Sequence, residues 1–224
     1  KQVQVTMTDK LLPSEKMHQK DSLDRARIEA RISQSEDYSE SRGVFKTWHA
    51  GLKEAGHQTH GRDGRIYFPG HPDVAVTRKG DVFGRYQDVR KMLDSTGATG
   101  KRTPGFAGIE AHHLVEHRLL KYFGFTREEG ASVAVYSHEH MELVHGGGAT
   151  IEDSLSKGLV YDIDEIVEVH EQHYRQIGRP EWGVELKSFV RENSERILHT
   201  YEAGGVPGST KADYARVKAF LEKL

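Results

Sequence analysis

Cysteine is absent from the 224-residue chain. Without thiols the protein has neither a disulfide framework nor a thiolate zinc site, so any bound metal must use histidine, carboxylate or amide ligands. Hydrophobic residues make up only 36% of the sequence, and the mean hydropathy is -0.68. The length still suffices to bury a core, and the composition predicts a soluble globular protein with charged surface helices.

Long apolar runs are absent as well. No segment approaches the roughly 20 apolar residues that a membrane-spanning helix needs. The N-terminus also lacks the basic-then-apolar pattern of a signal peptide, so we expect no membrane segment. The chain begins at Lys1 rather than at a methionine, as expected of a tagged form or of a piece of a longer polypeptide.

An excess of one charge is also missing, since 32 basic residues nearly balance 34 acidic ones. Their distribution is nevertheless uneven. Seven basic residues accompany three acidic ones within Thr77–Arg102, whereas six acidic residues accompany a single lysine within Ile151–Val169. The pattern fits two solvated faces, and the alternative is that the basic segment serves the histidine-rich segment that follows it.

The spacing of apolar residues predicts an α+β fold. Capping residues and apolar periodicity predict helices over residues 14–34, 41–55, 163–177, 183–203 and 210–224. Short β-rich runs between Pro-Gly and Lys-Gly turns predict a small antiparallel sheet, with strands near residues 66–68, 74–76 and 82–83, and residues 132–136 form a further short β-rich run. Residues 95–105 hold three glycines and a proline, which favours a flexible loop.

Histidine, in contrast, is clustered. Six of the 14 histidines lie within one stretch of 34 residues, at His112, His113, His117, His138, His140 and His145. Neutral imidazole is the commonest metal ligand. Neighbouring side chains on an extended segment point to opposite faces, so one imidazole of the His112–His113 pair can bind an ion while the other faces a reacting water. His140 is predicted in the first turn of a short helix over residues 137–145, where its ring can reach the same ion.

This order of a strand with two histidines, a loop, a second strand and a helix with another histidine is that of the ββα-metal unit of nucleases. In that unit a divalent cation neutralises the scissile phosphate and stabilises the leaving 3′-oxygen, and a neighbouring histidine deprotonates the attacking water. One ion and one base suffice, because charge on the phosphate oxygens dominates the barrier.

Two segments, "EAHHLVEHRLLKYFG" and "SVAVYSHEHMELV", carry a more specific resemblance. They resemble the HNH/endonuclease VII-type nuclease domains found at the C-termini of bacterial polymorphic toxins. The typical form of those domains is an "HHLIE-R" segment followed by an "SV-L---EH" segment. The matching positions are His112, His113, Leu114, Glu116 and Arg118 in the first block, and Ser132, Val133, Glu139 and His140 in the second.

The resemblance implies that His112 and His140 are metal ligands and that His113 is the general base. No asparagine lies between the two blocks to match the middle letter of the HNH name, so the group that takes its role is left open. Glu116 either binds the ion, orients an imidazole or is an ordinary exposed carboxylate. Arg118 either holds a phosphate oxygen or pairs with an acid. The expected nucleic-acid contacts are Lys101, Arg102 and Lys121.

We expect an N-terminal helical segment over residues 1–60 and a nuclease domain over residues 61–224. The ββα-metal core is expected at about residues 106–148, followed by C-terminal helices. His140 ranks first because it matches the second block. His138 and His145 share one face of a helix, being seven residues apart, and whether either joins the site is left open.

The resemblance implies a metal-dependent endonuclease, with DNA favoured as its substrate and little sequence specificity. It further implies the toxic domain of a secreted bacterial effector that acts in the cytoplasm of a target cell, and a cognate immunity protein in the producing cell. Mg²⁺ is the expected ion, with Zn²⁺, Ni²⁺ and Mn²⁺ as alternatives. The competing interpretations are a ribonuclease toxin of the same fold and a non-catalytic protein-binding module with a structural zinc ion.

Overall fold

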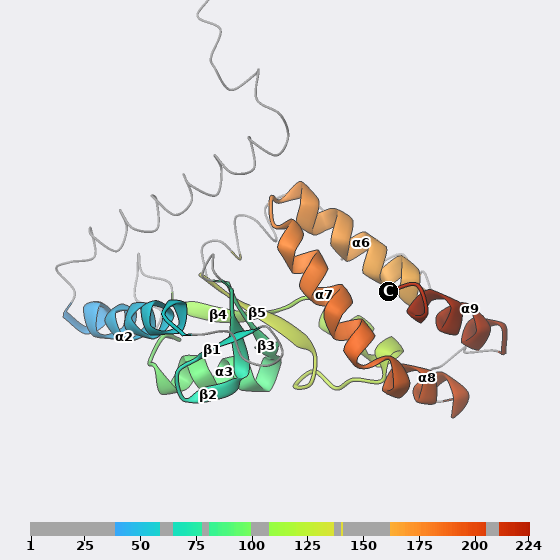
Figure 1. The fold of residues 1–224 in the computed structure, drawn as a ribbon, viewed down its shortest axis with the longest axis horizontal. Coiled ribbons are helices and arrows are strands. Elements are labelled where there is room, and N and C mark those ends of the chain that lie inside the picture. Colours follow the sequence, from blue (N-terminus) through green and yellow to red (C-terminus); the bar gives the residue numbers. More distant parts are fainter. Residues whose placement is uncertain are drawn as a thin grey trace, which may run out of the picture. The chain divides into compact units, whose positions relative to one another are not determined.

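Five short strands form one antiparallel sheet in the computed structural model of the protein (Figure 1). Their order across the sheet is β1-β2-β3-β5-β4, so β4 lies at one edge and pairs with β5. The strands are β1 (Ile66–Phe68), β2 (His71–Val76), β3 (Val82–Arg85), β4 (Ile109–His113) and β5 (Ala131–Tyr136).

The structure describes residues 39–58, 65–77, 81–99, 108–136, 140, 162–204 and 211–224. Val44–Leu224 form one compact unit, to which the sheet belongs, and Lys1–Gly43 form another. The helix predicted over residues 14–34 lies outside the described residues.

The strands follow the residue pattern that predicted them. In β2, Val74 and Val76 are buried and Ala75 between them is partly exposed, which is the period of two expected of a strand. Gly70 turns the chain from β1 to β2 with a φ of 77°, a conformation that glycine adopts without strain. The small antiparallel sheet is confirmed, and the His112–His113 pair lies at the end of β4 as expected.

Most of the predicted helices are confirmed, as α2, α6 and α9. In the described ranges, no helix is both long enough and apolar enough to cross a membrane. The helices are α2 (Ser39–Gly56), α3 (Tyr86–Ser95), the 3-10 helix η3 (His117–Phe123), α6 (Ile163–Gln176), α7 (Pro180–Glu192), α8 (Ser194–Glu202) and α9 (Lys211–Leu221).

One expectation about helices was wrong, and one helix was not predicted. The single helix predicted over residues 183–203 is two helices, α7 and α8, divided at Asn193. The Asn193 side chain donates to the carbonyl of Phe189 at 2.8 Å, a local bond that competes with continued helix. Helix α7 also begins earlier, because Pro180 suits the first helical turn. Helix α3 was missed, because only Val89, Met92 and Leu93 form its buried face, within a strongly charged segment.

Buried side chains pack on the sheet in two hydrophobic clusters. Val82 and Phe83 are neighbours in β3 but lie in different clusters, since successive strand residues point to opposite faces. One cluster joins β1–β3 to α2 and α3, and Trp48 of α2 stacks on Phe68 with ring centres 5.6 Å apart. The other joins β5 and η3 to the C-terminal helices. The α+β class is thereby confirmed.

Candidate functional site

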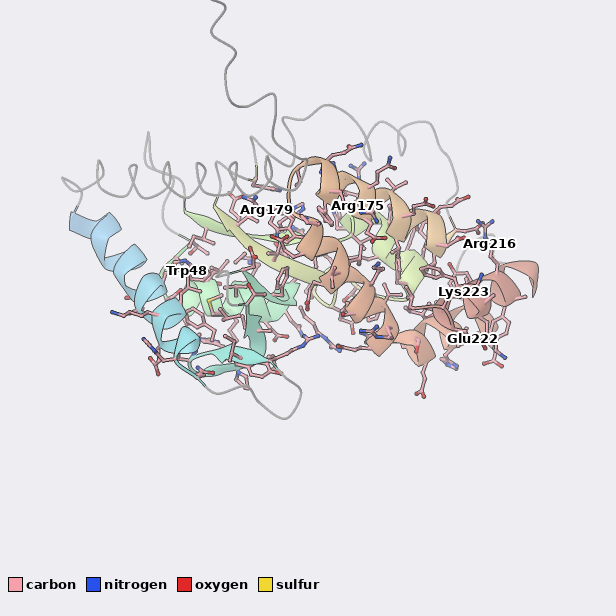
Figure 2. All side chains as sticks on the ribbon, turned by 45° about the horizontal axis from the view of Figure 1, so that its top comes forward. Trp48, Arg175, Arg179, Arg216, Glu222 and Lys223 are labelled. Carbon is pink, nitrogen blue, oxygen red and sulfur yellow. The ribbon has the colours of Figure 1, made fainter. Side chains whose placement is uncertain are left out.

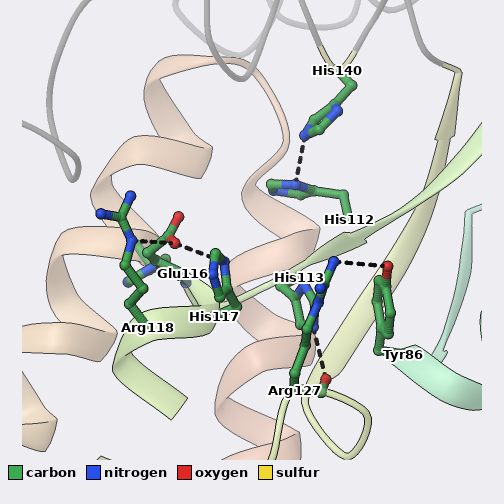
Figure 3. Close-up of polar contacts among 9 residues, drawn as sticks. Tyr86, His112, His113, Glu116, His117, Arg118, Arg127 and His140 are labelled. Carbon is green, nitrogen blue, oxygen red and sulfur yellow. Dashed lines mark hydrogen bonds and ion pairs between the residues drawn. The ribbon is translucent and has the colours of Figure 1, made fainter. Parts of the chain in front are cut away.

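The rings of His112, on β4, and His140, in the segment after β5, meet beside the edge of the sheet (Figure 3), and Glu110 contacts His140 as well. Nδ1 of His112 lies 3.1 Å from Nε2 of His140, 28 residues later in the chain. Nδ1 of His140 lies 3.0 Å from Oε2 of Glu110. Glu110 and His112 share one face of β4 because they are two residues apart on a strand. The structure therefore brings together the two histidines predicted as metal ligands and adds Glu110.

The contact with Glu110 fixes the position of one proton on His140. A carboxylate only accepts hydrogen bonds, so Nδ1–H of His140 donates to Glu110. When the His140 ring is neutral, its Nε2 carries a lone pair that accepts from Nδ1–H of His112. A shift of the His112 proton to Nε2 leaves two lone pairs facing each other, which is the arrangement of two ligands on one ion.

The separation of the two ring nitrogens fits a shared ion. With metal–nitrogen bonds of about 2.0–2.1 Å, neighbouring ligand atoms are about 2.9–3.0 Å apart in octahedral geometry and about 3.3–3.4 Å apart in tetrahedral geometry. The observed 3.1 Å lies between these values. In the described part of the chain, no three His, Asp or Glu side chains form a ligand cluster. Two imidazoles are thus the protein ligands available among these residues.

His113 lies on the other side of β4, against α3 (Figure 3). Its ring stacks on Tyr86 with a centre separation of 4.2 Å and an interplanar angle of 14°. Nε2–H donates to the backbone carbonyl of Arg127 at 2.8 Å, so Nδ1 carries the lone pair. Burial of the ring lowers the pKa of His113 below its ordinary value. The side chain is therefore a neutral base with a fixed orientation.

The turn after β4 holds the other two side chains of the first motif block. Oε1 of Glu116 lies 2.9 Å from Nδ1 of His117 and accepts a hydrogen bond from Nε of Arg118 at 3.3 Å. The structure thus pairs Arg118 with Glu116, one of its two predicted roles. The imidazole that Glu116 contacts is that of His117 and not that of a predicted metal ligand, so its role at an ion stays a prediction.

Helix α6 fixes the backbone of the same turn. The Tyr174 hydroxyl donates to the carbonyl of Leu114 at 2.7 Å, and the backbone N–H of Glu116 donates to Nε2 of His170 at 2.9 Å. Nδ1–H of His170 donates in turn to the carbonyl of Ile166 at 2.7 Å. Burial lowers the pKa of His170 to about 4, so the ring is neutral and can accept that bond.

The chain matches no family model, no curated protein and no solved structure. Its relation to the HNH-type nucleases therefore stays a prediction that rests on the two motif blocks.

The predicted nucleic-acid contacts are only partly within the described residues. Lys121 is exposed on η3, with its ammonium 5.4 Å from the centre of the Tyr122 ring. Lys101 and Arg102 lie outside the described residues, as do His138, His145 and the remainder of the predicted helix around His140.

Sequence reasoning missed several side chains that position the site. Alternation along β4 was a usable signal for Glu110, because it places that carboxylate on the face of His112. No local pattern pointed to the contact of Tyr86 with His113, since α3 itself was not predicted. His170 and Tyr174 belong to the buried face of α6, where an apolar stripe predicts burial but not hydrogen-bond partners.

Proposed function

We propose that the protein is a metal-dependent endonuclease of the HNH type that hydrolyses phosphodiester bonds through a ββα-metal core. The observation that carries the proposal is the convergence of His112 and His140 at 3.1 Å, with a separately oriented neutral histidine at the next position of the same strand. DNA is the favoured substrate, and RNA is the alternative within the same chemistry.

Each histidine has a distinct task in the proposed reaction. A divalent cation held by His112 and His140 would neutralise charge on the scissile phosphate. His113 accepts the proton of the attacking water at Nδ1, while its Nε2–H stays on the Arg127 carbonyl. The water oxygen bonds to phosphorus and the bond to the 3′-oxygen breaks. The leaving oxygen takes a proton from solvent, so the products are a 5′-phosphate and a 3′-hydroxyl.

The donor set bears on the choice of ion. Imidazole nitrogens suit Zn²⁺ and Ni²⁺ better than Mg²⁺ or Mn²⁺, which prefer oxygen ligands. The pairing of His140 with Glu110 resembles the carboxylate–histidine support common behind transition-metal ligands. We therefore expect the borderline transition metals to bind more tightly than Mg²⁺, which remains a candidate for supporting cleavage.

The test is cleavage of supercoiled plasmid, and separately of mixed-sequence RNA, by metal-free protein supplied with each of these ions. Cleavage should need an added ion and stop with EDTA. The His113→Ala variant should lose about 100-fold or more in rate, the usual contribution of a general base. His199→Ala, which alters an exposed histidine in the last turn of α8, should retain full activity. Cleavage that persists in EDTA, or none with any ion, would contradict the proposal.

The proposed biological setting follows from the resemblance to toxin domains. The nuclease acts as the toxic domain of a secreted effector, reaches the cytoplasm of a target cell, and is blocked in the producing cell by an immunity protein. Expression of the chain in a bacterial cytoplasm should arrest growth, whereas expression of the His113→Ala variant should not. Normal growth with the active protein would argue against the toxin role while leaving the nuclease chemistry open to direct assay.

A further inference from the structure

A second group of side chains surrounds His113 from α3 and from the turn before β5 (Figure 3). Tyr86 stacks on the imidazole, with ring centres 4.2 Å apart. The guanidinium carbon of Arg127 lies 5.3 Å from the centre of the Tyr86 ring, and its Nη2 donates to the Tyr86 hydroxyl at 3.4 Å. The guanidinium carbon of Arg90, one helical turn beyond Tyr86, lies 5.8 Å from the same ring centre.

The row of polar side chains continues on the other side of His113. The His117 ring lies 6.1 Å from the His113 ring, and Glu116 links His117 to Arg118. We call this set the basic track, and it consists of Arg90, Tyr86, Arg127, His113, His117 and Arg118.

The charge balance of the track favours an anionic ligand. Arg90 and Arg127 are exposed, and no carboxylate in the described part of the chain forms an ion pair with either. On α3, Asp88 interacts electrostatically with Arg85, Lys91 and Asp73. Glu116 is engaged at the far end of the track.

Both arginines approach the ring of Tyr86, and this contact restricts their freedom before binding. A guanidinium that rests on an aromatic face has less freedom to lose, and its planar fork matches two oxygens of a phosphate. Tyr86 also contacts His113, so the arginines and the proposed base are oriented by one side chain.

We propose that Arg90 and Arg127 bind the backbone phosphates that flank the scissile phosphate, so that the basic track is the path of one nucleic-acid strand. This inference rests on the proposed nuclease function and extends it from chemistry to substrate binding. The ligand is a polynucleotide rather than a small diester, because the two arginines contact phosphates that a small diester lacks. Such contacts carry no information about base identity, which agrees with low sequence specificity.

The experiment compares two substrates that share a phosphodiester bond but differ in flanking phosphates: plasmid DNA and bis(p-nitrophenyl) phosphate. The proteins are the wild type, Arg90→Ala, Arg127→Ala, the double variant, and Arg175→Ala as a charge-matched control on α6 (Figure 2). The Arg127→Ala substitution retains the backbone carbonyl that holds His113. The double variant should lose about tenfold or more in kcat/KM on plasmid relative to its loss on the small diester. The slope of log affinity for DNA against log salt should fall by about one for each arginine removed.

Several results would overturn the inference while leaving the nuclease proposal intact. These are equal losses on both substrates, no loss on plasmid, or an equal loss in the Arg175→Ala control. If the wild type hydrolyses neither substrate, the proposed function fails. Binding of a short fluorescent DNA duplex in EDTA then decides the inference by itself. Weaker binding by the double variant than by Arg175→Ala supports the track as a nucleic-acid surface, and unchanged binding overturns it.

Discussion

At the scale of single residues, Glu110 has the clearest effect on the candidate metal site. Its carboxylate accepts from Nδ1 of His140 at 3.0 Å and thereby orients that ring so that Nε2 faces His112. A carboxylate in this position also raises the basicity of the ligand ring. Glu110 is thus a positioning residue that acts through His140.

Substitution Glu110→Gln should weaken Zn²⁺ or Ni²⁺ binding about 10- to 100-fold, the usual cost of losing such a partner. The amide oxygen still accepts the hydrogen bond, but the negative charge that favours the ligand ring is gone. Calorimetric titration of metal-free protein measures the affinity. The matched control is Glu222→Gln, since Glu222 is an exposed carboxylate near the C-terminus. Equal affinities for wild type and Glu110→Gln would rule out this role.

Protonation of His170 should lower the free energy of unfolding of the protein. Burial lowers its folded-state pKa to about 4, below the ordinary 6.5 that applies when the chain is unfolded. The unfolded chain therefore binds the proton first as the pH falls. The stability that the neutral ring contributes is complete above 6.5 and is lost as the pH falls from there through about 4.

The free energy of unfolding of the wild type should thus decrease by up to about 3 kcal/mol more than that of His170→Gln over this pH window. Denaturant titrations at several pH values measure both proteins. His199→Gln serves as the control, because an exposed histidine should leave the pH profile of the wild type unchanged. Parallel profiles for wild type and His170→Gln would show that the buried ring is not the titrating group.

The two motif blocks were sufficient to predict that His112 and His140 meet, and the structure brings their ring nitrogens to 3.1 Å. They offered a pairing of Arg118 with Glu116 as one alternative but could not decide among the roles of Glu116, because its partners depend on which side chains lie nearest after folding. His117 and Arg118 are those neighbours. Partners from distant segments, such as Tyr86, are set by tertiary packing and leave no local signal.

At the scale of secondary-structure elements, α6 supports the turn that follows β4. Its periodicity predicted the helix and the buried face that includes Ile166 and Val167. The side chains of His170 and Tyr174 lie on this face, and both form hydrogen bonds with the backbone of the turn. A buried carbonyl without a partner costs free energy, so these bonds fix the turn after the His112–His113 pair.

A second link between elements ties α8 to the turn before β5. The Arg196 guanidinium donates to both carboxylate oxygens of Glu129, at 2.7 and 3.1 Å, and to the carbonyl of Gly124 at 2.9 Å. Its carbon also lies 4.4 Å from the centre of the Phe125 ring. The hydrogen bonds from Arg196 lower the pKa of Glu129 to about 2.

Substitution Arg196→Met should lower the free energy of unfolding by about 1 kcal/mol at neutral pH, since the pair is partly exposed. The stability from a carboxylate with a lowered pKa is present above its ordinary value of 4.5 and is lost as the pH falls toward 2. The difference between variant and wild type should therefore shrink across that range in urea titrations. Arg175→Met, which removes an exposed pair on α6, should cost at most about 0.5 kcal/mol. A difference that is independent of pH would contradict the assignment.

At the scale of the whole molecule, the candidate site lies at the edge of the five-stranded sheet. Two hydrophobic clusters pack on the opposite faces of this sheet. The α+β class could be predicted because the periodicity changes along the chain from helix to strand and back. The strand order could not, because β4 and β5 join the meander β1-β2-β3 through non-local pairing. That pairing places His112 and His113 on opposite faces of one edge strand, where different elements contact each ring.

The most direct test of this account is the binding of Zn²⁺ or Ni²⁺ to three metal-free proteins, measured by calorimetric titration beside plasmid cleavage. The wild type should bind one exchangeable ion and cut. His113→Ala should bind one ion with similar affinity and not cut, and His140→Ala should neither bind that ion nor cut. Equal binding by His140→Ala and the wild type, or loss of binding in His113→Ala, would contradict the division of roles between the two faces of β4.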